Sequence, residues 1–299
     1  MDKPLIVGVD GSEPSLRALD WAADEAALHG VPLRVVHASR WEWYEGREPS
    51  FGINGSSVQD LSERIAASAV ERALRRTDSV KATAEVLSED PGLALVRLSR
   101  EADAVVVGSH GRGELTELLL GSVGLSVAAH AVSPVIVVRG REENLEGCFR
   151  TVVVGVGDFE DGSGDGSEGG SEEVSPAVEF AFREAQSLAS SVTVVHAWRC
   201  PARELPDFPV MVHDEHQERA AAQVDKAVRK AVAAHPGVKV RREIVEGHAR
   251  TVLLHASRTA DLLVVGARRR KGHVGMQLGP VNHAVLHHAA CPVAVIPHT

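Results

Sequence analysis

The sequence predicts an α/β protein built from two tandem doubly wound domains, each with a five-stranded parallel sheet. Three observations indicate this fold class. Short β-branched apolar runs alternate with stretches whose apolar residues recur at the helical period. The same order of elements occurs twice along the chain. The length of 299 residues is long for one domain and sufficient for two, each with its own core.

The first half contains valine-rich runs that are short and mostly lack polar alternation, so we expect both faces of the sheet to be covered. The strands are expected at 5–9, 33–38, 82–87, 104–108 and 134–138. Helices are expected between them, near 14–29, 57–77, 91–101 and 115–131. This alternation predicts parallel strands joined by right-handed crossovers.

The second half repeats the pattern, with strands expected at 151–156, 192–197, 239–245, 262–266 and 292–296. A polar, charged stretch at 140–150 separates the two sets of strands. We therefore expect domains at 1–142 and 150–299. The Gly/Ser/acidic segment 161–173 is an insertion relative to the first half and predicts a solvated loop. It is either a plain spacer or a regulatory, partner-binding segment.

Composition narrows the class of protein. A net charge of −9 argues against a general nucleic-acid binder, and the basic cluster 268–271 does not overturn this. The sequence lacks an apolar run long enough for a membrane span and a signal-peptide pattern at its start. Cys148, Cys200 and Cys291 are odd in number and scattered, so no disulfide framework is expected. A cytoplasmic location is the simplest expectation.

One stretch, 105–126, has the spacing of a phosphate-binding segment. Gly108 ends a strand, Gly111 and Gly113 follow in a turn, and Gly121-Ser122 precedes a helical pattern. Glycines let backbone N–H groups approach an anion, and a helix start adds partial positive charge. In an open parallel sheet such a site lies beyond the carboxyl ends of the strands.

Two other strand ends are expected to border the same crevice. Asp10-Gly11-Ser12 follows the first strand, and His37-Ala38 ends the second. Asp10 can accept a hydrogen bond from a ribose hydroxyl or an adenine amine, and His37-Ala38 can form the floor under the base. The glycine spacing alone is common in turns. Its combination with Gly-Ser at a fixed distance and with the repeated strands is more specific.

These motifs resemble the universal stress protein family in a tandem, two-domain form. The resemblance is carried by VGVDGS (7–12), VVHA (35–38), VVVGSHGRG with LLLGSV (105–123) and PVIVV (134–138). It implies the adenine nucleotide alpha hydrolase-like fold and ATP as the ligand, with or without Mg²⁺. It also implies a nucleotide-dependent stress-response or regulatory role.

The resemblance places the following residues around ATP: Asp10, Gly11, Ser12, Ala38, Gly108, Ser109, His110, Gly111, Arg112, Gly113, Gly121, Ser122 and Val123. It further implies dimerisation through the last strand of each domain. Residues 134–138 and 292–296 are therefore expected to pair within the chain, and a homodimer and an unidentified protein partner are further expectations.

The second copy of the motif departs from the first. Gly266 and Gly279 hold the places of Gly108 and Gly121, but other donor positions have changed. The changes are Gly157 for Asp10, Arg269 for Gly111, Lys271 for Gly113 and Pro280 for Ser122. Proline removes a hydroxyl and a backbone N–H yet fits the first turn of a helix. We therefore predict that the second domain is mainly a scaffold.

The alternative for the second domain is a site in which basic side chains hold phosphate in place of backbone groups. Its candidate residues are Gly157, Asp158, Ala197, Gly266, Arg268, Arg269 and Gly279.

No residue is assigned a catalytic role and no metal site is assigned. One alternative function is a slow ATPase or self-phosphorylating enzyme, with Asp10 as base or metal ligand and Ser109 or Ser122 as phosphate acceptor. Another is a flavin or cyclic-nucleotide binder. His283 and His287 lie four apart on an expected helix and are interpreted as surface or packing residues. His37 and His196 occupy equal places in the repeats and are expected to pack or hydrogen-bond at strand ends.

Overall fold

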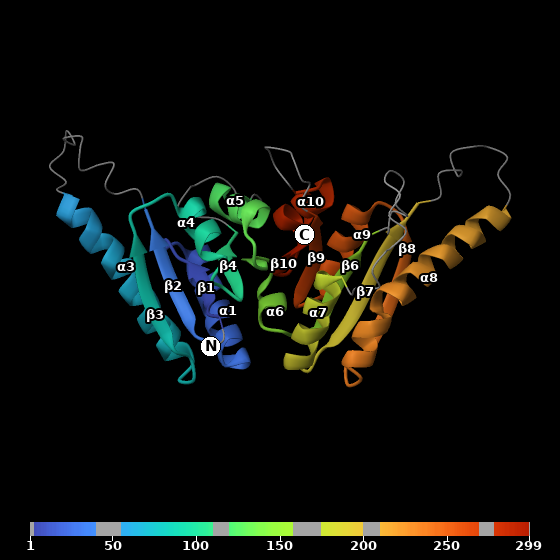
Figure 1. Ribbon diagram of the computed structural model, residues 1–299, viewed down its shortest axis with the longest axis horizontal. Helices are drawn as coiled ribbons and strands as arrows, with labels where there is room; N and C mark the ends of the chain where they lie inside the picture. Colours follow the sequence, from blue (N-terminus) through green and yellow to red (C-terminus); the bar gives the residue numbers. More distant parts are fainter. Residues whose placement is uncertain are drawn as a thin grey trace.

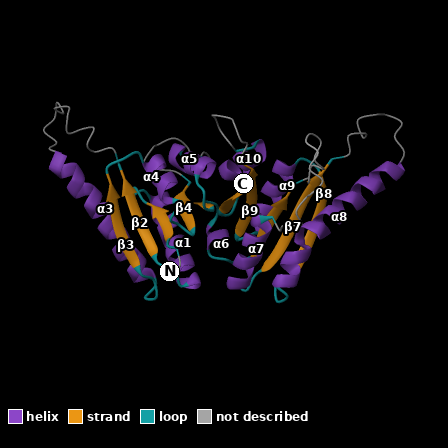
Figure 2. Ribbon diagram, viewed as in Figure 1, coloured by secondary structure: helices purple, strands orange, loops and turns teal. Residues whose placement is uncertain are grey.

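In the computed structural model, ten strands form one sheet with helices on both faces (Figures 1 and 2). The structure describes residues 3–39, 55–109, 120–157, 175–199, 210–268 and 278–298. Figure 1 shows the two halves of the chain as the arms of a broad V. None of the helices in these ranges has the length and apolar character that crossing a bilayer requires.

The first half has the expected order of elements. They are β1 (Leu5–Gly8), α1 (Glu13–His29), β2 (Leu33–Ala38), α3 (Gly55–Arg76), β3 (Ala82–Leu87), α4 (Pro91–Leu98), β4 (Ala104–Gly108), α5 (Ser122–His130) and β5 (Val135–Val138). The prediction that the last helix begins near residue 115 is wrong for Leu120 and Gly121. Gly121 has extended backbone, with φ −64° and ψ 156°, and it caps a helix that begins at Ser122.

The second half repeats this order after a short connecting helix. The elements are α6 (Glu142–Leu145), β6 (Thr151–Val156), α7 (Pro176–Ser187), β7 (Ser191–Trp198), α8 (Val210–Ala234), β8 (Val240–Glu246), α9 (Ala249–Ala256), η2 (Ser257–Thr259), β9 (Leu262–Arg268), α10 (Pro280–His288) and β10 (Val293–His298).

The strands follow the order β3-β2-β1-β4-β5-β10-β9-β6-β7-β8. Pairing is parallel inside each half, as predicted, and antiparallel where β5 meets β10. At that junction Val135 lies opposite Val295, and Val137 lies opposite Val293. The expected pairing of the last strands within the chain is thereby confirmed, and it joins two five-stranded sheets into one.

Helices α1, α3, α7 and α8 cover one face of the sheet, and α4, α5, α9 and α10 cover the other. Successive strand residues point to opposite faces, so Leu5 and Val7 enter the first core and Ile6 enters the second. Both cores run through the two halves. The expectation that both faces of the sheet are covered is confirmed, although Thr83 of β3 and Arg241 of β8 are exposed in the edge strands.

The segment after β5 is attached to the second domain. The Arg139 guanidinium is buried and donates to the carbonyl oxygens of Leu286 and Ala289 at the end of α10. The side-chain amide of Asn144, which is also buried, donates to the carbonyl of Ala260 at 2.7 Å. Although the stretch 140–150 is polar in composition, its first residues therefore pack as part of the domain interface.

Candidate functional site

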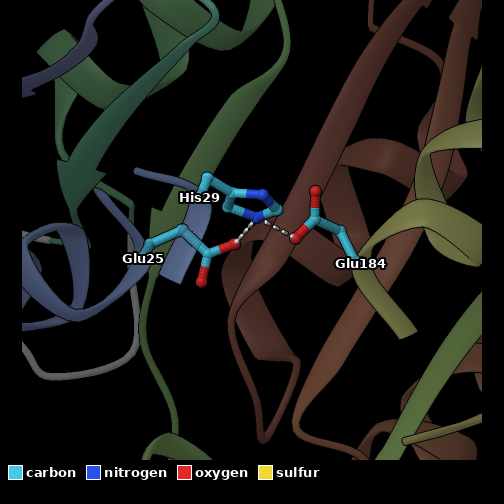
Figure 3. A group of neighbouring side chains, drawn as sticks. All are labelled: Glu25, His29 and Glu184. Atoms are coloured by element: carbon cyan, nitrogen blue, oxygen red, sulfur yellow. Dashed lines mark hydrogen bonds and ion pairs between the residues drawn. The ribbon is translucent and has the colours of Figure 1, made fainter. Parts of the chain in front are cut away.

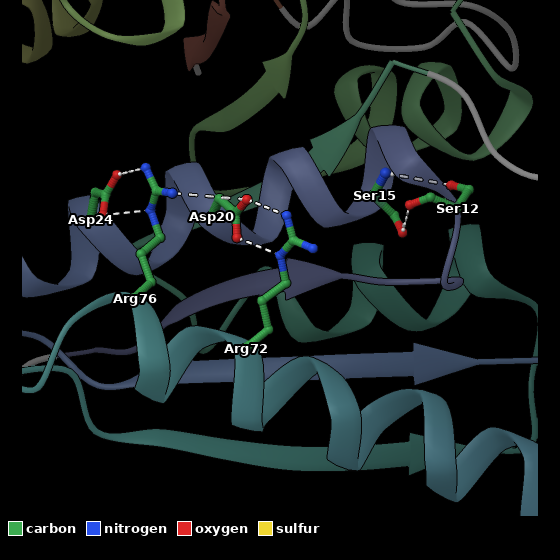
Figure 4. A network of polar contacts seen from close by, with 6 residues as sticks. All are labelled: Ser12, Ser15, Asp20, Asp24, Arg72 and Arg76. Carbon is green, nitrogen blue, oxygen red and sulfur yellow. Dashed lines mark hydrogen bonds and ion pairs between the residues drawn. The ribbon is translucent and has the colours of Figure 1, made fainter.

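The turn after β1 is held by a local hydrogen-bond network. Oδ1 of Asp10 accepts from the backbone N–H of Ser12 at 2.9 Å and from its hydroxyl at 2.6 Å. Ser12 caps α1, because its Oγ accepts from the N–H of Ser15 (Figure 4). Gly11 has a φ of +80°, which a glycine adopts without strain. Asp10 thus holds the residue that caps α1. This structural role is in addition to the nucleotide contact predicted from the sequence.

Two ion pairs hold α1 against α3. Arg72 makes a bidentate contact with Asp20 through bonds of 2.7 and 2.6 Å. One turn further along both helices, Arg76 contacts Asp24 in the same way, at 2.8 and 2.6 Å (Figure 4). Bidentate pairs restrict orientation as well as distance. The second half of α1 is therefore held in a defined position against α3.

Gly108 lies where β4 meets the first turn of α1. β1 and β4 are neighbours, with Val7 opposite Val106, so the Asp10 turn and Gly108 reach the same edge of the sheet. A Cβ added to Gly108 would lie only 2.6 Å from the carbonyl oxygen of Pro14. This glycine is therefore required for helix–strand packing, a reason that the phosphate-binding pattern alone does not give.

The two ends of the predicted phosphate motif are joined directly. The N–H of Gly121 donates to the carbonyl of Ser109, which is buried, at 2.8 Å. The N–H of Gly121 is therefore used within the protein and is not available to a ligand. The N–H groups in the first turn of α5 have no carbonyl partner within the helix. Ser122 is exposed, Val123 is half-buried, and this first turn contains no acidic residue. This arrangement suits an anion.

The end of β2 is fixed by a buried histidine. Nδ1 of His37 donates to the carbonyl of Val9 at 2.8 Å, and Ala38 follows half-buried at the same edge. In the second domain Nδ1 of His196 donates equally to Val156 at 2.9 Å. These contacts confirm the expected packing and hydrogen-bonding role of both histidines.

The second domain has the same backbone at the equivalent position. Gly279 caps α10 with φ −68° and ψ 166°, close to the values at Gly121. Pro280 is the first residue of α10, so the expectation that proline fits the first turn is confirmed. Gly157 and Gly266 are exposed at the ends of β6 and β9, and Ala197 lies near the end of β7.

A further difference between the domains was missed from the sequence. Asn282 of α10 is buried, and its side-chain amide donates to the carbonyl of Gly266 at 3.0 Å. The equivalent residue in α5 is Gly124, which has no side chain to direct at Gly108. The sequence does show this difference: the motif GSVG of the first domain corresponds to GPVN in the second, and the two differ at the third residue after the capping glycine. In the first domain the Leu120 side chain lies beside the equivalent position, since a Cβ added to Gly124 would be 2.9 Å from its Cδ1.

Several predicted site residues lie outside the described part of the chain. They are His110, Gly111, Arg112, Gly113, Asp158 and Arg269.

One of the paired histidines of α10 contacts the first domain. Nδ1 of His287 accepts a hydrogen bond from the N–H of Leu120 at 2.9 Å. The rings of His283 and His287 are stacked, with centroids 5.4 Å apart. Their interpretation as packing residues is confirmed by these contacts.

The sequence model of the universal stress protein family matches residues 1–139 and 164–297, and the chain therefore belongs to this family. A universal stress protein of Mycobacterium tuberculosis (strain ATCC 25618 / H37Rv) is 34% identical over 309 residues, which cover 99% of each chain.

A solved structure shares the fold over the length of the chain. The crystal structure of a universal stress protein from Archaeoglobus fulgidus DSM 4304 matches 99% of this chain and 98% of its own, with a TM-score of 0.68 and 18% identity. A structure of the universal stress protein from Archaeoglobus fulgidus in complex with dAMP matches 45% of this chain and 96% of its own, with a TM-score of 0.35 and 27% identity.

Proposed function

We propose that the first domain of this universal stress protein binds ATP and that ATP occupancy regulates the protein without dedicated catalysis. The observation that carries the proposal is the start of α5, which is joined to the end of β4 by the bond between Gly121 and Ser109. It offers first-turn N–H groups and the Ser122 hydroxyl at the edge where the Asp10 turn also lies.

ATP fits the chemistry of this edge. The phosphates would lie against the first turn of α5, where the helix dipole is positive and no acidic side chain opposes them. The base and ribose would lie toward the Asp10 turn and Ala38, at the ends of the neighbouring strands β1 and β2. When Mg²⁺ is bound, it would neutralise phosphate charge. Oδ1 of Asp10 already accepts two bonds from Ser12, which favours a positioning role for Asp10 over that of a general base.

The second domain serves as a scaffold in this proposal. Pro280 removes an N–H and a hydroxyl, and the Asn282 side chain bonds the carbonyl of Gly266, a contact that Gly124 cannot make with Gly108. The domains are proposed to span 1–142 and 150–299, in agreement with the internal repeat. A cytoplasmic location, where ATP is available, completes the proposal.

Variants that copy the second domain into the first test this function. Gly124→Asn should place an amide against Gly108, and Ser122→Pro should remove a hydroxyl and an N–H. Loss of one such donor costs about 1–2 kcal/mol, or roughly five- to thirty-fold in affinity. The matched control is Asn282→Gly, which alters the equivalent position of the second domain. Calorimetric titration with ATP should give one site per chain, weakened by Gly124→Asn and Ser122→Pro and unchanged by Asn282→Gly.

Other outcomes would contradict the proposal. Two ATP per chain in the unaltered protein would refute the scaffold role of the second domain. Unchanged affinity in both first-domain variants would refute the site. Mass spectrometry and absorbance of the ligand released from purified protein identify a flavin or a cyclic nucleotide if either is the natural occupant. Multiple turnovers of ATP that are lost in Asp10→Ala would show an enzyme instead.

A further inference from the structure

Three metal-ligating side chains meet between the two domains, far from the proposed nucleotide site along α1. Nε2 of His29 lies 3.0 Å from Oε1 of Glu25 and 3.1 Å from Oε2 of Glu184 (Figure 3). The ligand atoms of the three residues all lie within 4.8 Å of one another. Figure 3 shows both carboxylates directed at the same ring nitrogen.

The fold explains why these side chains converge. Glu25 and His29 are four residues apart in α1, so they share one face of the helix. Glu184 belongs to α7, the equivalent helix of the second domain. Antiparallel pairing of β5 with β10 brings the two helices together on the same face of the sheet. Each domain therefore contributes to a cluster that neither contains alone.

The cluster is largely shielded from solvent. The Glu184 side chain is 3% exposed, that of Glu25 is 13% exposed and that of His29 is 22% exposed. Burial of a charged carboxylate is costly unless a cation faces it. Arg183 approaches Glu184 from outside at 3.5 Å, and His29 lies between the two carboxylates. His29 is the most exposed of the three side chains.

The spacing of the ligand atoms matches a zinc site. Zinc bonds histidine nitrogen and carboxylate oxygen at about 2.0–2.2 Å, so neighbouring ligands in a tetrahedral site lie about 3.3 Å apart. The two distances from Nε2, 3.0 and 3.1 Å, are close to this value. Without a metal, hydrogen bonds join the three groups, because Glu25 and Glu184 also bond each other. A metal ion would displace the shared protons and contact both oxygens and the nitrogen together.

We propose that Glu25, His29 and Glu184 bind a divalent transition-metal ion, with Zn²⁺ as the best match, and that the ion links the two domains. Carboxylate oxygen and imidazole nitrogen are both ligands for such ions, and water would complete the coordination. The bound ion would stabilise the arrangement of α1 against α7. This site stands independently of nucleotide binding.

The full chain, first stripped of metal with a chelator, provides the test. Zn²⁺ binding is measured by competition with a chromophoric chelator, and Co²⁺ serves as a spectroscopic probe of coordination. We expect one Zn²⁺ per chain, a higher thermal midpoint on binding, and at least a hundred-fold weaker affinity in His29→Gln. Glutamine keeps a hydrogen-bond donor but not the imidazole ligand. Glu184→Gln should weaken binding as well.

The control is His283→Gln on α10, because His283 and His287 form the competing pair of histidines. It should leave Zn²⁺ affinity and stoichiometry unchanged. Circular dichroism of each variant verifies that it folds. The proposal is overturned if the unaltered protein binds no Zn²⁺, or if His29→Gln binds it as tightly as the unaltered protein. A loss of binding in His283→Gln alone would move the site to α10 and overturn it equally.

Discussion

The backbone N–H of Leu120 donates a hydrogen bond to Nδ1 of His287, and this bond joins the two domains directly. Leu120 is buried and immediately precedes Gly121, the cap of α5. Helix α10 of the second domain therefore holds the start of the helix that we propose to bind phosphate. In the internal repeat, Ala129 of the first domain is the equivalent of His287. Alanine cannot accept such a hydrogen bond, so the first domain makes no matching bond to the second through this position.

Removal of this acceptor should weaken ATP binding in the first domain. In His287→Ala the N–H of Leu120 loses its partner, which costs about 1–3 kcal/mol for a buried group. The start of α5 should then be held less firmly, so we expect roughly three- to ten-fold weaker ATP binding by calorimetry. His283→Ala removes the stacked neighbour but keeps the bond from Leu120 to His287, so it should keep the affinity. Equal affinity in His287→Ala would show that the bond does not position the site.

Gly140 should tolerate no side chain. Its φ is +102°, and an added Cβ would lie 2.2 Å from the carbonyl oxygen of Ala290. Both the backbone and the domain contact must shift, so Gly140→Ala should lower the free energy of unfolding by more than about 3 kcal/mol. Gly147→Ala is the matched control, since Gly147 has a φ of +72° with nothing within 4 Å. It should cost about 1 kcal/mol. Urea denaturation measures both, and equal costs would contradict this account.

Stability should depend on pH through Glu25. Burial raises the pKa of Glu25 from 4.5 to about 8. The hydrogen bond to Glu184 raises the pKa of His29 to about 10. Burial opposes the charged form of Glu184, but hydrogen bonds with His29 and Glu25 outweigh it and lower its pKa. The folded protein thus holds an extra proton on Glu25 between pH 4.5 and about 8, and this contribution to stability is lost as pH rises through that window.

Glu25→Gln copies the protonated form and lacks this titration. In the presence of a chelator, the unaltered protein should lose stability relative to Glu25→Gln as pH rises from 4.5 to about 8. Denaturation at several pH values within this range measures the difference. A difference that stays constant would show that Glu25 ionises normally in the folded protein.

The two cysteines that the structure describes should differ in reactivity. Cys148 is exposed, whereas Cys291 is buried and its burial raises the pKa of its thiol. Because the thiolate is the reactive form, iodoacetamide should modify Cys291 on the order of a hundred-fold more slowly than Cys148 in the native protein. Peptide mass spectrometry measures both rates, and labelling in urea should remove the difference. Similar native rates would mean that the region around Cys291 opens readily.

Most of the fold could be predicted from local patterns. Strands β4 and β9 were predicted because valine-rich runs without polar alternation are typical of buried parallel strands. The exposed residues of the edge strands β3 and β8 were not predicted, because exposure depends on which elements pack against a strand and not on the strand sequence alone. The start of α5 was misplaced since apolar Leu120 fits a helical pattern while Gly121 is extended.

The sites were predictable to different degrees. The glycine and serine positions of the nucleotide motif follow from the repeat, although the packing of Gly108 against Pro14 needs three-dimensional information. Asn282 was visible as a difference from Gly124, but its bond to Gly266 was not. The contact between His29 and Glu184 joins residues 155 positions apart. No local pattern indicates that contact, because it depends on how two complete domains meet.

The junction of β5 with β10 has a consequence for stoichiometry. Separate copies of these two domains would associate in all combinations, and the mixed pair would be one product among several. Within a single chain, the copy with Gly124 always meets the copy with Asn282, at a high effective concentration that dilution does not change. Because one chain carries both domains, the two unlike domains are always present in equal number and always pair with each other.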